Sequence, residues 1–126
     1  MTKMLQIFKC ETCGNIIQVM HEGQGELVCC GAPMQLLIPY EQKDETGEKH
    51  VPIFLNDSSV QVGSVLHPMI EKHYIEFIET LSSDGSEVYI KFLQPGQAPC
   101  MNIGSGDFTR AIEYCNIHGL WQGNKE

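Results

Sequence analysis

The apolar residues of this chain lie in short runs that are rich in β-branched and aromatic side chains. Among the first 38 residues, two such runs, 5–8 and 16–20, are interrupted by Cys-Gly and Gly-rich turns. Runs of this kind, bounded by turn residues, predict short β-strands. We therefore expect two or three short strands in residues 1–38.

After residue 50 the same pattern continues with the runs VPIFLN, VQVGSVL, HYIEFIETL and EVYIKFL. Asp84-Gly85 separates the last two runs and is typical of a hairpin turn. Several short strands at this spacing predict a small immunoglobulin-like antiparallel β-sandwich over residues 50–126. The run FTRAIEY at 108–114 fits either a helical turn or a strand.

Between the two parts, residues 39–49 (PYEQKDETGEK) are polar and charged and show no periodicity, so we expect a linker or long loop. The first part contains four cysteines and four glycines and too few apolar residues to fold well by burial alone. A bound metal would have to stabilise it. The predicted fold is therefore all-β: a small metal-stapled β module, residues 1–38, followed by the sandwich.

Charge and composition narrow the classes of protein. Eight Lys and Arg residues stand against sixteen Asp and Glu residues, and the net charge of −8 opposes binding to nucleic acid. No apolar run is long enough for a signal peptide or a membrane span, so we expect a cytoplasmic protein with no membrane contact. Cytosolic thiols stay reduced, so the six cysteines are better explained as metal ligands than as disulfides.

Two pairs of cysteines form the first candidate metal site. Cys10 and Cys13 lie on one tight turn, and Cys29 and Cys30 bring a second pair from a later strand. Four thiolates suit Zn or Fe in tetrahedral geometry. Adjacent side chains normally point apart, so the backbone must bend at the second pair. A structural zinc site and a vicinal disulfide are the alternatives.

Histidines in three short clusters form the second candidate site. Taken singly, a histidine in a β domain is more often a surface or hydrogen-bonded residue than a ligand. Four histidines and a cysteine in three clusters favour a mononuclear transition metal, whose identity the ligand types leave open. The five residues are His50, His67, His73, Cys115 and His118.

These motifs resemble a known family. Residues 5–38, with Cys29-Cys30-Gly31-Ala32-Pro33-Met34, resemble desulforedoxin, a small rubredoxin-like iron module. The later motifs, Glu48-Lys49-His50-Val51-Pro52, His67-Pro68-Met69 with His73, and Cys115-Asn116-x-His118-Gly119-x-Trp121, resemble superoxide reductase, the neelaredoxin-like domain of desulfoferrodoxin. Together the two resemblances cover nearly the whole chain.

The resemblance implies two iron ions per chain and the reduction of superoxide to hydrogen peroxide. The first iron would be held by Cys10, Cys13, Cys29 and Cys30. At the second, catalytic iron, His50, His67, His73 and His118 would be equatorial ligands and Cys115 the axial ligand. Lys49 would attract the substrate, and Glu48 would close the open axial position in the oxidised state. A rubredoxin-like electron donor and a homodimer are also implied.

Two rival functions follow from the same residues. In a pure electron-transfer protein both irons would carry electrons and no substrate would bind, whereas a zinc-stapled binding module would be colourless. Cys100 and His21 lie outside the motifs, and we expect a free thiol and a surface residue. Met34 and Met69 are expected to pack, as methionines usually do. Trp121 is expected to cover the imidazoles.

Overall fold

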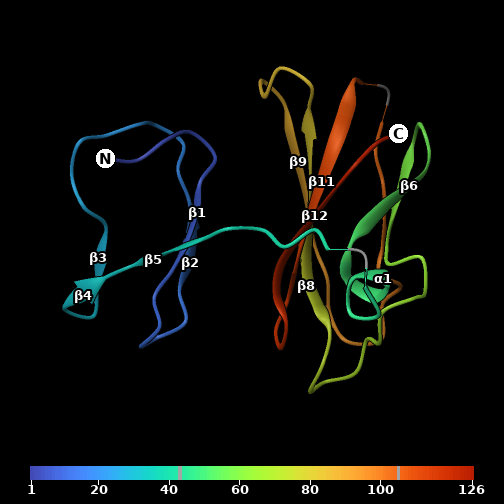
Figure 1. Ribbon diagram of the computed structural model, residues 1–126, viewed down its shortest axis with the longest axis horizontal. Helices are drawn as coiled ribbons and strands as arrows, with labels where there is room; N and C mark the ends of the chain where they lie inside the picture. Colours follow the sequence, from blue (N-terminus) through green and yellow to red (C-terminus); the bar gives the residue numbers. More distant parts are fainter. Residues whose placement is uncertain (43, 105) are drawn as a thin grey trace. The chain divides into compact units, whose positions relative to one another are not determined.

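The computed structural model describes residues 1–42, 44–104 and 106–126 (Figure 1). It divides the chain into two compact units, Met1–Ile38 and Pro39–Glu126. The segment 39–49, which we expected to be a linker or loop, belongs to the second unit, and Lys43 within it lies outside the described residues. Nearly all regular elements are strands, which confirms the predicted all-β class.

The first unit consists of a three-stranded antiparallel sheet in the order β2-β1-β5 and a separate two-stranded hairpin, β3-β4 (Figure 1). The strands are β1 (Ile7–Lys9), β2 (Ile16–Gln18), β3 (Val28–Cys29), β4 (Ala32–Pro33) and β5 (Gln35–Leu37). Its buried apolar residues are Ile7, Cys10 and Val19. Burial this limited agrees with a module that needs a metal for stability.

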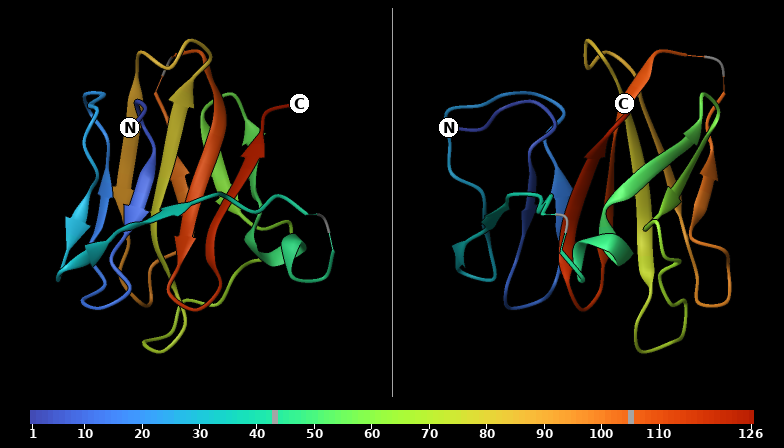
Figure 2. Two further views of the ribbon diagram at one scale, coloured as in Figure 1. Left: turned by 60° about the vertical axis from the view of Figure 1, so that its left-hand side comes forward. Right: turned by 45° about the vertical axis from the view of Figure 1, so that its right-hand side comes forward.

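The second unit is a sandwich of two antiparallel sheets (Figure 2). One sheet has the order β10-β7-β6 and the other the order β12-β11-β8-β9. The strands are β6 (Pro52–Asn56), β7 (Ser59–Val62), β8 (Ile75–Ser82), β9 (Val88–Phe92), β10 (Cys100–Asn102), β11 (Phe108–Cys115) and β12 (Gly119–Asn124). A single turn of helix, α1 (Gly47–His50), precedes β6.

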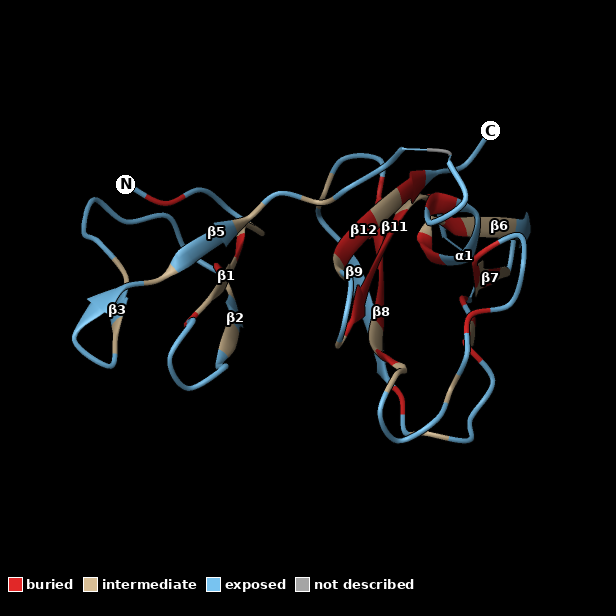
Figure 3. Cartoon of the chain, turned by 60° about the horizontal axis from the view of Figure 1, so that its bottom comes forward, coloured by how far each residue is buried: buried red, intermediate tan, exposed pale blue. Residues whose placement is uncertain are grey.

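The core of the sandwich lies between the two sheets, and Figure 3 shows the buried segments gathered on β8, β11 and β12. Inward side chains from both sheets form it: Val60, Val62, Ile75, Ile78, Leu93, Met101, Ile103, Phe108, Ala111 and Cys115. Cys115, at the end of β11, is thus part of the core as well as a candidate ligand.

Two sequence expectations are settled by the strand pairing. The hairpin predicted at Asp84-Gly85 is confirmed, because β8 pairs with β9 around this turn and Gly85 has φ +75°. The run 108–114, which fitted a helix or a strand, belongs to β11, which pairs with β8 and β12.

The topology gathers several strand ends at one end of the sandwich. In the four-stranded sheet, β8 begins, β11 ends and β12 begins at this end, because neighbouring strands are antiparallel. In the other sheet Pro52, at the start of β6, pairs with Val62, at the end of β7. The loops that leave these ends carry the candidate ligands of the second site.

Candidate metal centres

Two tight turns of the first unit present the four cysteines. Cys10 follows β1, and its turn closes through a 2.9 Å hydrogen bond from Gly14 N to Cys10 O. In the β3–β4 hairpin, Cys29 pairs with Ala32, and the two residues between them, Cys30 and Gly31, have φ +54° and +75°. Positive φ at both central residues is typical of a type I′ turn. This is the backbone bend that the adjacent cysteines required.

The four sulfurs are spaced as ligands of one cation. The Sγ atoms of Cys13 and Cys29 are 3.6 Å apart, those of Cys29 and Cys30 are 4.0 Å apart, and all four lie within 4.8 Å of one another. Four sulfurs at about 2.3 Å from one tetrahedral metal are about 3.8 Å apart. The Cys29–Cys30 separation is about twice the length of a disulfide bond, which excludes the vicinal disulfide.

The thiols differ in acidity. Backbone N–H groups of Cys13 and Thr12 lower the pKa of the Cys10 thiol to about 6. Hydrogen bonding with neighbouring sulfurs, first of all Cys13, raises the pKa of Cys30 to about 12. A cluster without a cation would therefore keep protons, and a bound metal would displace them so that all four sulfurs act as thiolates.

The second unit brings the four histidines and Cys115 together, with one ligand atom of each within 4.8 Å of the others. His50 is the last residue of α1, and His67 lies in the loop after β7. His73 precedes β8, where it forms an isolated bridge with Ile70. Cys115 ends β11, and His118 lies in the turn to β12. Residues far apart in sequence thus meet at one end of the sandwich.

The four imidazoles are arranged as the corners of a square. Neighbouring ring centroids are 4.6 Å apart for His50–His67, His67–His73 and His50–His118, and 5.0 Å apart for His73–His118. His50 and His73 are farther apart, at 6.3 Å, and nearly parallel at 29°. Neighbouring rings are steeply inclined, at 59° to 83°. His50 and His73 therefore occupy opposite corners, as equatorial ligands of one metal would.

Hydrogen bonds orient the rings and leave nitrogens for a metal. His50 Nδ1 lies 2.8 Å from Thr46 O and His67 Nδ1 lies 2.7 Å from Pro68 O, so each ring can donate there. Their Nε2 atoms are then 3.1 Å from each other. Two nitrogens at right angles on a metal at about 2.1 Å are about 3.0 Å apart. Among the described residues, buried His73 Nε2 has no hydrogen-bond partner, as expected of a ligand atom.

Burial keeps the imidazoles of His50, His67 and His73 neutral, which is the form that binds metals. It lowers the pKa of His50 and of His73, and it lowers the pKa of His67 to about 4. The mutual repulsion of the ring charges acts in the same direction.

Cys115 places its sulfur on the buried side of the square. Its Sγ is 3.4 Å from His67 Nε2 and 3.8 Å from His118 Nδ1, and it accepts a 3.4 Å hydrogen bond from His118 N. The residue is fully buried, and burial raises the pKa of its thiol. Metal binding would therefore have to displace the thiol proton.

A cavity of about 400 Å³ lies beside the imidazoles. It is lined by Glu45, Thr46, Lys49, His50, His67, Pro68, His73 and His118. All four histidines border it and Cys115 does not, so the cavity opens on the square from the side away from the sulfur. A metal bound by the square would be reachable from this cavity.

The structure separates the two residues that the sequence pairs as functional. Lys49 lines the histidine cavity, whereas Glu48 lines a different one, of about 300 Å³, with Val51, Ile53 and Ser64 among its neighbours. The carboxylate beside the histidines is that of Glu45, which sequence reasoning missed. Nothing in the sequence marks Glu45 as a residue of this cavity, because its place there depends on how the chain turns into α1.

The other expected residues are placed as follows. Trp121 stacks on His50 with ring centroids 5.0 Å apart and donates to His118 O at 3.1 Å, so of the four imidazoles it covers that of His50. Met69 packs against the core of the sandwich, as expected. Cys100 is a half-buried free thiol, and His21 is exposed.

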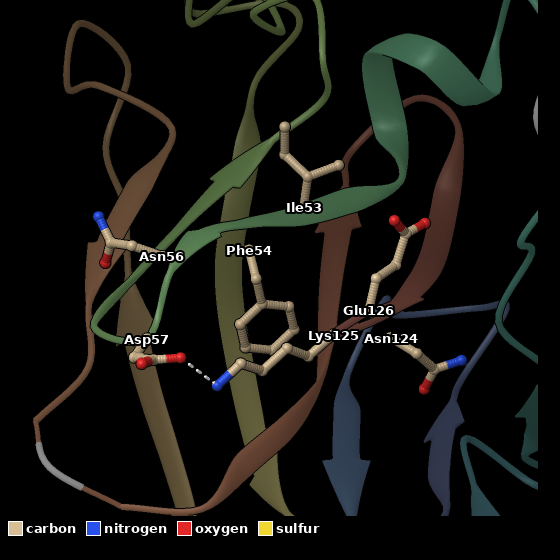
Figure 4. A pocket seen from close by; sticks show the side chains of 7 residues that line it. All are labelled: Ile53, Phe54, Asn56, Asp57, Asn124, Lys125 and Glu126. Carbon is tan, nitrogen blue, oxygen red and sulfur yellow. Dashed lines mark ion pairs between the residues drawn. The ribbon is translucent and has the colours of Figure 1, made fainter.

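A further groove, of about 360 Å³, lies between β6 and the end of the chain (Figure 4). Ile53, Phe54 and Asn124 are among its lining residues, and Lys125 forms a 2.6 Å ion pair with Asp57 across it. Among the described residues that line this groove there is no histidine or cysteine, and the two donor groups lie elsewhere.

Comparisons with known proteins match both units. The family model described as the desulfoferrodoxin N-terminal domain matches residues 2–37, and the desulfoferrodoxin model matches residues 42–124. This family holds one iron in a site of four cysteines and one in a site of four histidines and a cysteine, and the chain has the matching donor group for each. The structure also has no helix, over the described residues, that is long and apolar enough to cross a membrane.

Individual relatives match this chain along almost its whole length. A desulfoferrodoxin homolog from Archaeoglobus fulgidus is 48% identical and covers 97% of this chain and 98% of its own. A desulfoferrodoxin from Nitratidesulfovibrio vulgaris is 49% identical with the same coverage. The crystal structure of the superoxide reductase from Treponema pallidum has a TM-score of 0.74 and 25% identity over 98% of this chain and 100% of that one. With both family models matched in order and each donor group assembled in the structure, this chain belongs to the desulfoferrodoxin family.

Proposed function

We propose that the chain is a superoxide reductase: superoxide takes up one electron and two protons at the iron of the histidine square and leaves as hydrogen peroxide. One observation carries this proposal. The four imidazoles form a square with the sulfur of Cys115 on the buried side and a cavity on the other side. The name of the Treponema pallidum relative, a superoxide reductase, supports the same reaction. Ferrous iron in this donor set would supply the electron.

The residues of the cavity would handle the substrate. Lys49 supplies a positive charge at the cavity wall, and its charge also acts on the His50 and His73 imidazoles. A small anion entering the cavity is attracted by this charge. Glu48 would close the open position only after α1 changes its conformation, because in this structure it lines the other cavity.

The iron of the histidine square, called the second centre below, would be re-reduced by an electron from outside that centre. We propose a rubredoxin-like protein as the external one-electron donor, as the resemblance to superoxide reductase implies. The iron held by the four cysteines of the first unit would be able to carry one electron. All six cysteines are free thiols, and the proposed function needs five of them reduced, which favours the cytoplasm.

We also propose a homodimer formed through the first unit. Phe8 pairs with Ile17 on one side and with Leu36 on the other, so the three side chains share one face of the sheet. Ile17 is 39% exposed and Leu36 is 38% exposed. A second copy could cover this face. Sedimentation that finds only monomer would contradict this part of the proposal.

Anaerobic titration with azide tests the function against the rival of pure electron transfer. Azide is a small anion that fits the cavity, so it should perturb the thiolate-to-iron absorption of the second centre and leave the first unchanged. A sealed second centre would show no perturbation and would favour electron transfer. A colourless protein that contains zinc would contradict both.

A further inference from the structure

Three aromatic rings form a continuous row from the surface of the second unit to the histidine square. The ring centroids of Tyr40 and Trp121 are 5.2 Å apart at an interplanar angle of 50°, and those of Trp121 and His50 are 5.0 Å apart at 25°. Tyr40 is 52% exposed, whereas Trp121 and His50 are each 2% exposed. The row therefore begins in solvent and ends on a residue that belongs to the donor group of the second centre.

The backbone holds Tyr40 at the start of this row. Tyr40 N donates to Leu120 O at 2.9 Å, and Gln122 N donates to Tyr40 O at 2.9 Å, so Tyr40 is bridged in parallel to Trp121 on β12. The next residue is fixed as well, because Gln122 Nε2 donates to the carboxylate of Glu41 at 2.7 Å. Tyr40 is thus a fixed part of the second unit.

The other two rings are held equally firmly. Trp121 Nε1 donates to His118 O at 3.1 Å, and His50 Nδ1 lies within 2.8 Å of Thr46 O. Each ring of the row is therefore fixed by a contact other than the stacking itself. Such a row keeps constant separations, and constant separations are what reproducible electronic coupling needs.

A protein donor needs such a route. It is far too large to enter the 400 Å³ cavity, so its electron must enter through residues at the surface of the second unit, and the exposed ring of Tyr40 is one such residue. Electronic coupling falls steeply with distance and is stronger through contacting π systems than across gaps. We propose that Tyr40 and Trp121 form the entry route by which a docked one-electron donor, a small reduced iron–sulfur protein, passes its electron to His50 and the iron that it holds.

The inference rests on the proposed function in requiring an iron at the second centre and an external protein as the one-electron donor. The donor loses one electron and the ferric iron gains it to become ferrous. No bond forms or breaks, no proton moves, and the two rings act as coupling elements that are not themselves oxidised. Tyr40 and Trp121 are therefore positioning residues for electron transfer.

Stopped-flow reduction of the oxidised second centre by reduced rubredoxin, used as the probe, tests the route. Tyr40→Leu removes the exposed ring and should slow this reduction several-fold. Tyr40→Phe keeps the ring and should react as the wild type does. Tyr89→Leu is the matched control, because Tyr89 is similarly exposed, at 49%, but lies on β9, and it should leave the rate unchanged.

Two further measurements separate a lost route from a damaged site. Dithionite, a small reductant that can use the cavity, should reduce all three variants at the wild-type rate, and redox titration should find one midpoint potential throughout. The chain has one tryptophan, so its emission should move to longer wavelength in Tyr40→Leu, where Trp121 loses its cover. Equal slowing with both reductants, or a shifted potential, would overturn the route.

The proposed function can fail independently. If the wild type does not oxidise on mixing with superoxide, the function is wrong whatever Tyr40 does. If the wild type reacts with superoxide but Tyr40→Leu is reduced by rubredoxin at the wild-type rate, the function stands and the route is wrong.

Discussion

At the scale of single residues, the surroundings of the second centre are set by α1 and by the turn that precedes it. Successive residues of a helix point about 100° apart, so Glu48 and Lys49 face different cavities although they are adjacent. Glu45 lies in the turn before α1 and lines the same cavity as Lys49. The charges that an entering anion meets are therefore those of Lys49 and Glu45.

Replacing Lys49 with Ala should slow the second-order reaction of the ferrous protein with superoxide. A unit charge about 6 Å from a unit anion contributes about 0.7 kcal/mol in bulk water and about 3 kcal/mol at an effective dielectric near 20. The expected loss is therefore between about threefold and about a hundredfold, with the iron content unchanged. Pulse radiolysis at low ionic strength measures it.

Lys72→Ala is the matched control for this prediction. Lys72 also precedes a histidine of the square, His73, but it does not line the cavity. Its removal should change the rate less than that of Lys49. Added salt should lower the wild-type rate and narrow the gap to Lys49→Ala, because ions screen exposed charges. A wild-type rate for Lys49→Ala at low salt would show that this lysine is only a surface residue.

The placement of Glu45 leads to a prediction of opposite sign. Glu45→Gln removes a negative charge from the cavity wall and should raise the rate with superoxide, by at most about threefold if the charge is well solvated. Glu48→Gln should leave this rate nearly unchanged while shifting the spectrum of the oxidised centre. The rate of reaction with superoxide, measured for both variants, tests this prediction. A faster reaction of Glu48→Gln with an unchanged rate for Glu45→Gln would mean that the two carboxylates exchange places in solution.

At the scale of elements, α1 depends on a close approach that only glycine permits. A Cβ atom at Gly47 would lie 1.8 Å from Gln42 O, and Gly47 N donates a 2.9 Å hydrogen bond to the Asp44 carboxylate. Gly47 O in turn accepts from Val51 N at 2.8 Å, which ends the turn just after His50. The backbone at Gly47 therefore fixes where His50 stands.

Gly47→Ala should consequently destabilise the second unit by about 1–3 kcal/mol and weaken iron binding at the second centre. Thermal unfolding and the rate of iron loss to a chelator measure the two effects. Gly104→Ala is the control, because a Cβ there has no heavy atom within 4 Å and the substitution should change neither quantity. Equal stability and equal iron loss in the two variants would show that α1 tolerates a Cβ atom at Gly47.

Elements also show how far the sequence could predict the fold and the site. The candidate ligands could be predicted because their motifs are short and local, and the hairpin at Asp84-Gly85 has a local turn residue. The run 108–114 was ambiguous because Ala111–Cys115 are all buried, which removes the alternation of a half-exposed strand. The contact of Tyr40 with Trp121 joins distant segments through one parallel bridge, for which sequence offers no pattern.

At the scale of the whole molecule, the two donor groups belong to separate compact units. The cysteine cluster lies wholly within Met1–Ile38 and the histidine square wholly within Pro39–Glu126. Each unit has its own sheets, and in the described residues each strand pairs only within its own unit. Loss of one metal should therefore leave the geometry of the other donor group intact.

Cys13→Ser tests this independence from the first unit. It removes one of four thiolates, so the first centre should lose its absorption or its iron, and the first unit should lose stability because its buried core is small. The second centre should keep its spectrum and its rate with superoxide, since the substrate would enter only the histidine cavity.

Cys115→Ser is the reciprocal variant and should remove the thiolate-to-iron absorption of the second centre and most superoxide reduction while sparing the first centre. Iron analysis should give two irons per chain in the wild type. The visible spectrum of each variant should show one intact centre. If Cys13→Ser slows the superoxide reaction as much as it damages the first centre, the two units are coupled, and the first iron is needed for the reaction or for the fold of the second unit.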